Sequence, residues 1–142
     1  MSDRTQAGIV EASKEKLDEL KELPYFEDGQ TVYRLSVAVA ITMGISVEKS
    51  LMKQPIKTMW RTQDDQTGRE MPRLDDRKGT LAQMIQCFVP EHATEPYRHS
   101  QYLATLGINY LHKKIIDEDA TPSEAIEDAI RSGATRVEES AS

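Results

Sequence analysis

The chain has 142 residues, of which 38% are hydrophobic and 30% charged, and its formal net charge is −6. This length suits one domain with a sizeable core, and no apolar run approaches the ~20 residues of a membrane-spanning helix. The single cysteine excludes an internal disulfide and zinc sites built from several thiolates, while the first residues lack the layout of a signal peptide, so we expect a cytoplasmic protein.

The charges are distributed unevenly along the chain. Residues 31–80 carry nine basic and six acidic side chains, whereas residues 117–142 carry two basic and eight acidic ones. From this pattern and the breaks in hydrophobic periodicity we expect a flexible start over residues 1–7 and a single helical domain over residues 8–116. An acidic helix and a disordered tail are expected over residues 117–142.

The N-terminal sequence predicts a short strand followed by an amphipathic helix. Residues 8–12 can form the strand, and the Ser13 hydroxyl can accept a backbone N–H of the first helical turn. Leu17 and Leu20 then fall on one helix face, and Pro24 ends the helix.

A second helix is predicted over residues 29–43, capped by Asp28 and stopped by Gly44. It is apolar almost all round, which is more than a helix that covers one core requires, so we expect it to assemble with a second copy. The order of strand, helix and helix is typical of ribbon-helix-helix proteins. The residues predicted for the oligomer interface are Val32, Leu35, Val37, Val39 and Ile41.

The middle of the chain is less regular in its hydrophobic pattern. Ser46 can cap a short helix that runs as far as Lys53. Residues 56–62 and 69–74 flank the turn-forming sequence QDDQTG, which is compatible with a hairpin or with an exposed loop. Thr80 and Gln83 then form a capping box for a helix in which Phe88 faces inward.

Two further helices are predicted before the C-terminus. Pro96 suits the first turn of a long helix, in which Gly107 predicts a close contact with another helix. Thr121 and Glu124 form a second capping box at the start of the acidic helix, and Gly133 is expected to end it.

The residue types that carry catalysis or hold metals are not grouped in this sequence. No Gly-rich phosphate loop and no nucleophile elbow occur. None of the histidines pairs with another at the spacing that puts two imidazoles on one helix face; they are His92, His99 and His112. Cys87 has apolar neighbours that predict a buried thiol. We therefore expect a protein that is not an enzyme and has no cofactor or metal.

Basic residues recur near a four-residue period in the middle of the chain. They could contact DNA phosphates, or they could form a solvated face without a partner. Trp60 among them could stack on an exposed base or anchor the segment to the core. Glu11 in the predicted strand would repel phosphate, so groove reading by that strand is not expected. The predicted DNA-binding residues are Lys49, Lys53, Lys57, Arg61, Arg69, Arg73, Arg77 and Lys78.

Three runs of the chain resemble a known family. They are SKEKLDELKEL (13–23), YRLSVAVA (33–40) and YLATLGINYL (102–111), and together they are similar to the E subunit of bacterial DNA sulfur-modification (phosphorothioation) systems. Arg34 matches the arginine that precedes the family's apolar helix. The resemblance implies a helical fold related to ribbon-helix-helix proteins, assembly into oligomers, and binding of nicked DNA through lysines.

The sequence thus predicts a mainly α fold, with a ribbon-helix-helix-like N-terminal half, a helical C-terminal half and little or no β structure. The predicted function is that of a non-enzymatic, DNA-associated accessory or regulatory protein of a DNA-modification or phage-defence system, binding the DNA backbone as an oligomer. The alternative is a protein-interaction subunit or antitoxin-like adaptor with the acidic helix 122–132 as its docking element. That helix could also cover the basic residues as an internal competitor.

Overall fold

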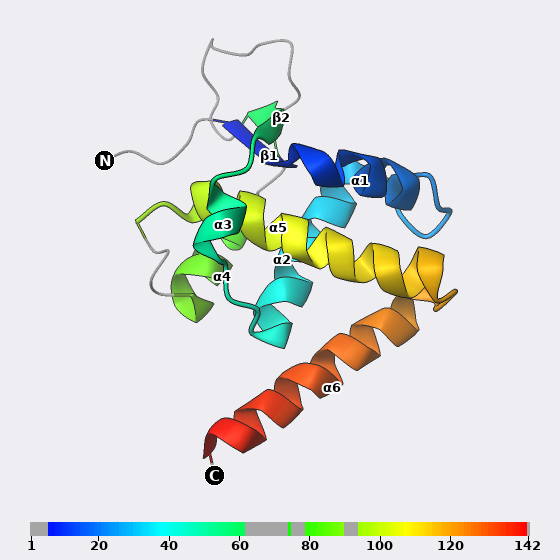
Figure 1. Cartoon of the computed structure of the whole chain (residues 1–142), viewed down its shortest axis with the longest axis vertical. Coiled ribbons are helices and arrows are strands. Elements are labelled where there is room, and N and C mark those ends of the chain that lie inside the picture. The colour runs from blue at the N-terminus through cyan, green and yellow to red at the C-terminus, as the bar shows by residue number, and fades with distance from the viewer. Residues whose placement is uncertain (1–5, 62–73, 75–78, 90–93, 142) are drawn as a thin grey trace.

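The structure is a computed structural model that describes residues 6–61, 74, 79–89 and 94–141. These residues are mainly helical, as predicted, with one small sheet (Figure 1). A 3₁₀ turn (Glu11–Ser13) precedes the first α-helix, and a π-helical turn (Lys113–Asp117) follows the helix that ends at His112. The other elements are β1 (Gln6–Val10), α1 (Lys14–Lys21), α2 (Gly29–Met43), α3 (Lys49–Met52), β2 (Ile56–Arg61), α4 (Thr80–Phe88), α5 (Pro96–His112) and α6 (Pro122–Ala141).

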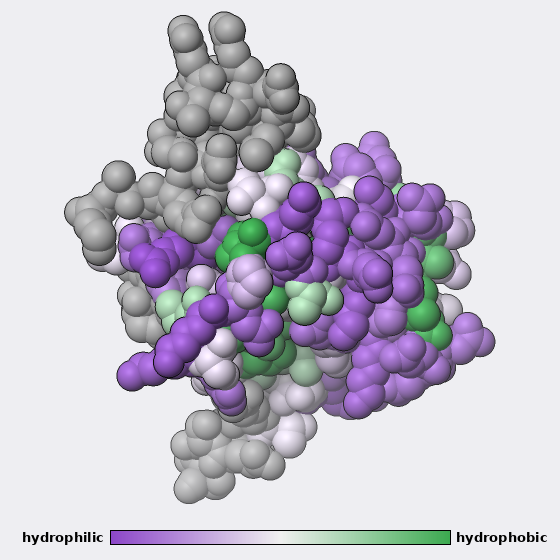
Figure 2. All heavy atoms as spheres, turned by 45° about the horizontal axis from the view of Figure 1, so that its top comes forward, coloured by the Kyte–Doolittle hydropathy of each residue, from purple (hydrophilic) through white to green (hydrophobic). Residues whose placement is uncertain are grey.

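The surface drawn in Figure 2 is mostly hydrophilic, with a hydrophobic area near the middle of the view. Among the helices that the structure describes, none combines the length and the apolar character needed to cross a membrane.

The sheet pairs two strands of the same chain. β1 and β2 are antiparallel, with Gln6 opposite Arg61 and Val10 opposite Ile56. A ribbon-helix-helix protein would instead pair this strand with its copy in a second chain, so the ribbon-helix-helix-like N-terminus is not confirmed. Gly8 is required at this pairing because a Cβ there would overlap the backbone carbonyl of Lys57. Residues 56–61, for which the sequence left a hairpin or an exposed loop open, therefore form a strand whose partner is β1.

Helix α2 lies at the centre of the molecule, between α5 and α6 and in contact with α1 (Figure 1). It crosses α5 where a Cβ on Gly107 would overlap the carbonyl oxygen of Ser36. The close helix contact predicted from Gly107 is therefore confirmed, and its partner is the backbone of α2.

The burial of α2 corrects the predicted oligomer interface. The side chains of Val32, Val37 and Val39 are buried in the chain's own core, and those of Leu35 and Ile41 are partly buried against it. The helix is apolar on several sides because α1, α5 and α6 each cover part of it. These five side chains are thus used for packing within one chain, and they do not require a second copy.

Of the helix caps predicted for α1, α2 and α4, two are confirmed and two are wrong. Asp28 accepts a hydrogen bond from the Thr31 backbone N–H at 2.8 Å, and Gly44 ends α2 in the left-handed conformation with φ 67°. Ser13 precedes α1, but its hydroxyl donates to Asn109 Oδ1 at 2.9 Å and does not cap the helix. At α4 the N-cap position belongs to Gly79, so the capping box predicted from Thr80 is wrong.

Helix α4 corrects two expectations about burial. Leu81 and Ile85, one turn apart, form its buried face. Cys87 is exposed because two residues beyond Ile85 correspond to a rotation of about 200° around the helix. Phe88 is 71% exposed and lies at the edge of a pocket. The buried thiol and the inward-facing phenylalanine are therefore both wrong.

Helix α6 begins as predicted but continues further. Thr121 and Glu124 form a reciprocal capping box, with N···O distances of 3.0 and 3.2 Å. The expected end at Gly133 and the disordered tail after it are wrong, because the helix runs to Ala141. Gly133 instead lies where α6 crosses α2, and a Cβ there would overlap the carbonyl oxygen of Thr42.

Candidate nucleic-acid interface

Three of the predicted DNA-binding lysines lie on one short segment, residues 49–57, which we call the basic segment. Lys49 begins α3, Lys53 follows its last residue, and Lys57 is the second residue of β2. All three side chains are exposed. Arg61 is the last residue of β2. The other four predicted residues lie outside the described residues; they are Arg69, Arg73, Arg77 and Lys78.

The basic segment is fixed to the body of the protein by hydrogen bonds to its backbone carbonyls. The Glu11 N–H donates to the Pro55 carbonyl at 2.9 Å, and the Tyr102 hydroxyl donates to the Met52 carbonyl at 3.5 Å. The pairing of β2 with β1 holds its last two residues, Ile56 and Lys57. The backbone that carries these lysines is therefore held in position by contacts with β1, the turn after it and α5.

Trp60 provides the side-chain anchor of β2. It is 5% exposed, and its ring meets that of Tyr33 edge to face, with centroids 5.0 Å apart. The Tyr33 hydroxyl lies 2.7 Å from Ser100 Oγ, which donates to the Tyr97 carbonyl. Of the two interpretations of Trp60, the anchor is confirmed, and the buried ring has no face free to stack on a base.

The lysines of the basic segment carry no ion pair with any described residue. This distinguishes them from Lys14, which pairs with Asp18, and from Lys114, which pairs with Glu118 and Asp128. Exposed Glu48 precedes the segment in the chain and exposed Glu11 is bonded to its backbone. Among the described residues, two nearby carboxylates therefore offset part of the positive charge of the segment, and no ion pair neutralises any of its lysines.

Strand β1 is not available for reading a groove. Ala7, Ile9 and Val10 are buried, and the Val10 N–H donates to Thr105 Oγ1 on α5 at 3.0 Å. Base readout needs outward side chains on an uncovered ribbon. Any nucleic-acid contact by the described residues must therefore come from another surface.

A pocket of about 270 Å³ lies beside the basic segment. It opens between the end of α2, the loop that leads to α3, the end of α4 and the middle of α5. Sequence reasoning missed it, because four separate segments meet there and no local pattern predicts their meeting. Its lining residues are Ile41, Gly44, Ile45, Ser46, Val47, Phe88, Val89 and Leu103.

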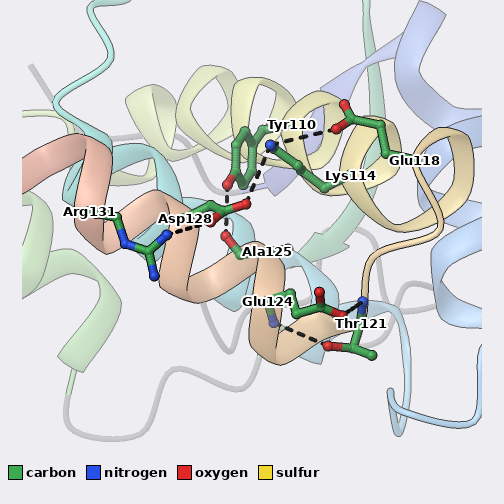
Figure 3. Close-up of polar contacts among 8 residues, drawn as sticks. All are labelled: Tyr110, Lys114, Glu118, Thr121, Glu124, Ala125, Asp128 and Arg131. Atoms are coloured by element: carbon green, nitrogen blue, oxygen red, sulfur yellow. Dashed lines mark hydrogen bonds and ion pairs between the residues drawn. The ribbon is translucent and has the colours of Figure 1, made fainter.

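A polar cluster joins α6 to α5 and the π-helical turn (Figure 3). The Tyr110 hydroxyl donates to the Ala125 carbonyl at 2.7 Å, and Lys114 Nζ lies 3.5 Å from Asp128 Oδ2. The Glu118 carboxylate raises the pKa of Lys114 above its usual value, and burial raises the pKa of Tyr110. Both groups therefore keep their protons at neutral pH, and the cluster holds α6 in place.

Among the described residues, no group of three or more histidine, cysteine or carboxylate side chains could hold a metal ion. His112 Nε2 lies 2.6 Å from Glu19 Oε2 and links α5 to α1. His99 is half-buried beside Tyr102, and His92 lies outside the described residues.

Comparisons of the chain with protein-family models, with curated proteins and with solved structures found no match. The function is therefore argued from the side chains themselves.

Proposed function

We propose that the protein is a non-enzymatic, DNA-associated accessory or regulatory protein that contacts backbone phosphates through the basic segment. The observation that carries this proposal is that Lys49, Lys53 and Lys57 are exposed, without an ion pair to any described residue, on a backbone anchored to the core. A lysine ammonium replaces a condensed counterion when it meets a phosphate, and the released ion favours binding.

The number of counterions that are released sets how strongly binding should depend on salt. Each neutralised phosphate contributes about 0.9 to the slope of log K against log salt, so three lysines predict a slope near −2.7 and a loss of about 40-fold between roughly 50 and 200 mM. The formal net charge of −6 opposes association at long range. We therefore expect weak binding that is seen at low salt and is insensitive to base sequence.

The resemblance of three sequence runs to the E subunit of DNA sulfur-modification systems supports assigning the protein to a DNA-modification or phage-defence system. It also makes nicked duplex the first substrate to test, with intact duplex and single strands beside it. The acidic helix α6 packs on α2, and its Asp128 pairs with Lys114 and Arg131. These ion pairs give no support to α6 as an internal cover of the basic segment.

The proposal is tested by the anisotropy of labelled DNA at about 50 mM salt. The triple variant Lys49→Gln, Lys53→Gln, Lys57→Gln should lose most of the binding. A matched control removes the same charge elsewhere, with Lys16→Gln, Lys21→Gln and Lys113→Gln. Equal binding by the two triple variants would overturn the proposal.

The alternative function is that of a protein-interaction subunit without direct DNA binding. The pocket beside the basic segment favours it, because a hollow bordered by an exposed phenylalanine suits a partner's side chain. If the wild-type protein binds none of the three DNA forms at low salt, the proposal of DNA binding is replaced by the protein-interaction function.

A further inference from the structure

The loop between α2 and α3 contains an extended segment, residues 45–48, which we call the extended loop (Figure 1). It lies outside the sheet that β1 and β2 form. Its side chains alternate, because Ile45 and Val47 are partly buried whereas Ser46 and Glu48 are exposed. Glu48 has φ −83° and ψ 149°, which lie in the β region. The extended loop therefore has the form of a strand with one face on the core.

The backbone in the middle of the extended loop is unpaired. At its start the Ile45 N–H donates to the Ala40 carbonyl at 3.1 Å, and at its end the Glu48 carbonyl accepts a backbone N–H of α3 at 3.1 Å. Between these bonds, the N–H and C=O groups of Ser46 and Val47 form no hydrogen bond with any described residue. The extended loop thus presents two donors and two acceptors, as the free edge of a sheet does.

The pocket of about 270 Å³ lies along this backbone, where Ile45, Ser46 and Val47 form part of its lining. The lining is more polar than apolar, although Ser46 has the only polar side chain among the described lining residues. Backbone N–H and C=O groups must therefore supply much of the polar lining. A purely apolar ligand would leave these groups without partners, which is unfavourable.

Another extended backbone is the ligand that matches alternating donors and acceptors. A lone cation or anion would pair only with the groups of one sign. When a peptide adds as a strand, its main chain makes the hydrogen bonds and its alternate side chains enter pockets. The volume of the pocket is several times the ~30 Å³ that one water occupies, so it has room for one branched side chain of such a peptide.

The charges that follow the extended loop favour an acidic peptide over a basic one. Lys49 and Lys53 are exposed, and neither has an ion pair with a described residue. Glu48 is the one carboxylate between the pocket and these lysines in the chain. A peptide that continues from the pocket toward α3 therefore meets two ammonium groups and one carboxylate, and complementary charge selects acidic residues there.

We infer that the extended loop and its pocket form a docking site for an extended, acidic peptide segment of a partner protein. The peptide forms main-chain hydrogen bonds with Ser46 and Val47 and places one apolar side chain in the pocket. This gives the alternative function, protein interaction, a partner of defined chemistry. The inference does not rest on DNA binding, and its tests contain no nucleic acid, so the two proposals can fail separately.

Nuclear magnetic resonance of the full chain tests the contact at the two free amides. The probe is a synthetic peptide of alternating valine and threonine with aspartates at both ends. The amides of Ser46 and Val47 should exchange rapidly with solvent in the free protein, and they should shift and become protected when the peptide is added. No change at these two amides at about 1 mM peptide would overturn the inference.

N-methylation of the probe tests whether the contact is made by the main chain. The N–H groups of an extended peptide point alternately to its two edges, so methylation of alternate residues removes the donors of one edge only. One of the two alternately methylated peptides should lose binding, and the other should bind as the unmodified peptide does. Equal affinity of the two methylated peptides would contradict main-chain pairing. This comparison uses the unaltered protein, so it does not depend on the folding of a variant.

Variants of the extended loop test the same contact from the protein side. Val47→Pro removes one N–H donor and should raise the dissociation constant of the peptide about tenfold, as the loss of one hydrogen bond does. Ser46→Ala is the matched control, since it removes a hydroxyl and keeps the main chain, and it should leave the affinity unchanged. Equal effects of the two variants would contradict the assignment, and circular dichroism checks that both are folded.

The flanking residues of the probe test the acidic character of the partner. The peptide with aspartate ends should bind more tightly than the same peptide with lysine ends, and raising the salt concentration should reduce the difference. In the double variant Lys49→Gln, Lys53→Gln the preference should disappear. Equal affinity of the wild-type protein for the two peptides would contradict an acidic partner.

Discussion

The ring of Trp60 meets the ring of Tyr33 edge to face, with 5.0 Å between centroids and an interplanar angle of 71°. This pair joins β2 to α2, and Tyr33 continues through its hydroxyl to Ser100 on α5. The aromatic contact therefore adds a side-chain anchor to the strand in which Lys57 lies, beside the hydrogen bonds that hold the basic segment.

Replacing Trp60 with alanine should destabilise the protein by about 3–5 kcal/mol, because it leaves a cavity beside Tyr33. Trp60→Phe should cost less, since a ring is retained against Tyr33. Urea denaturation followed by circular dichroism measures both. A loss below about 1 kcal/mol for Trp60→Ala would mean that the ring is not an anchor.

Gly107→Ala should lower stability although alanine favours helices by about 1 kcal/mol over glycine. The added Cβ would overlap the Ser36 carbonyl oxygen, and backbone cannot move aside as the end of a side chain can. Overpacking of this kind costs about 1–3 kcal/mol. The midpoint of thermal unfolding should fall. A rise, as expected from helix propensity alone, would show that α2 and α5 are not in backbone contact there.

Gly133→Ala should release α6 from α2 while the rest of the fold remains, because its Cβ would overlap the Thr42 carbonyl oxygen. Hydrogen exchange should then be faster in α6 and unchanged in α5. Ser132→Ala, at the exposed neighbouring position, is the control and should leave exchange in α6 unchanged. Unchanged protection of α6 in Gly133→Ala would argue against this docking.

Asp28 should contribute a pH-dependent part of the stability. Its hydrogen bond from the Thr31 backbone N–H, the largest cause, lowers the pKa of the carboxyl below its usual 3.8. A lowered pKa in the folded state means that the stabilisation is present above pH 3.8 and is lost as the pH falls through the folded value.

Asp28→Ala should therefore cost about 1 kcal/mol at neutral pH, as loss of an N-cap does, and less in acid. Asp28→Asn keeps an acceptor without the charge, so its stability relative to Asp28→Ala should not vary over this pH range. Denaturation at several pH values measures the difference. A constant gap between wild type and Asp28→Ala down to below the folded pKa would contradict the ionised cap.

Local signals were sufficient for part of this fold. The cap at Asp28, the left-handed Gly44 and the box of Thr121 and Glu124 each depend on residues within one turn of the chain. Gly107 indicated a close contact because glycine has few other uses inside a helix, but its partner Ser36 could not be read from its neighbours.

The errors at Thr80, Cys87 and Phe88 concern a single helix, and the others concern contacts between distant segments. The apolar sides of α2 suggested a second copy because nothing local shows that α5 and α6 cover them. Strand β2 lies about 50 residues from β1, so the pairing of Ile56 with Val10 has no local signature. For the candidate site, the period of the lysines was visible in the sequence, but the burial of Trp60 depends on where Tyr33 lies.

The most direct test of the central claim is the salt dependence of binding to a nicked duplex. For wild-type protein, the slope of log K against log salt should be near −2.7, corresponding to about three phosphate contacts. The Lys49→Gln, Lys53→Gln, Lys57→Gln variant should have a slope close to zero, and it should bind the DNA much more weakly. A slope that is the same in the wild type and in this variant would show that the basic segment does not contact the DNA backbone.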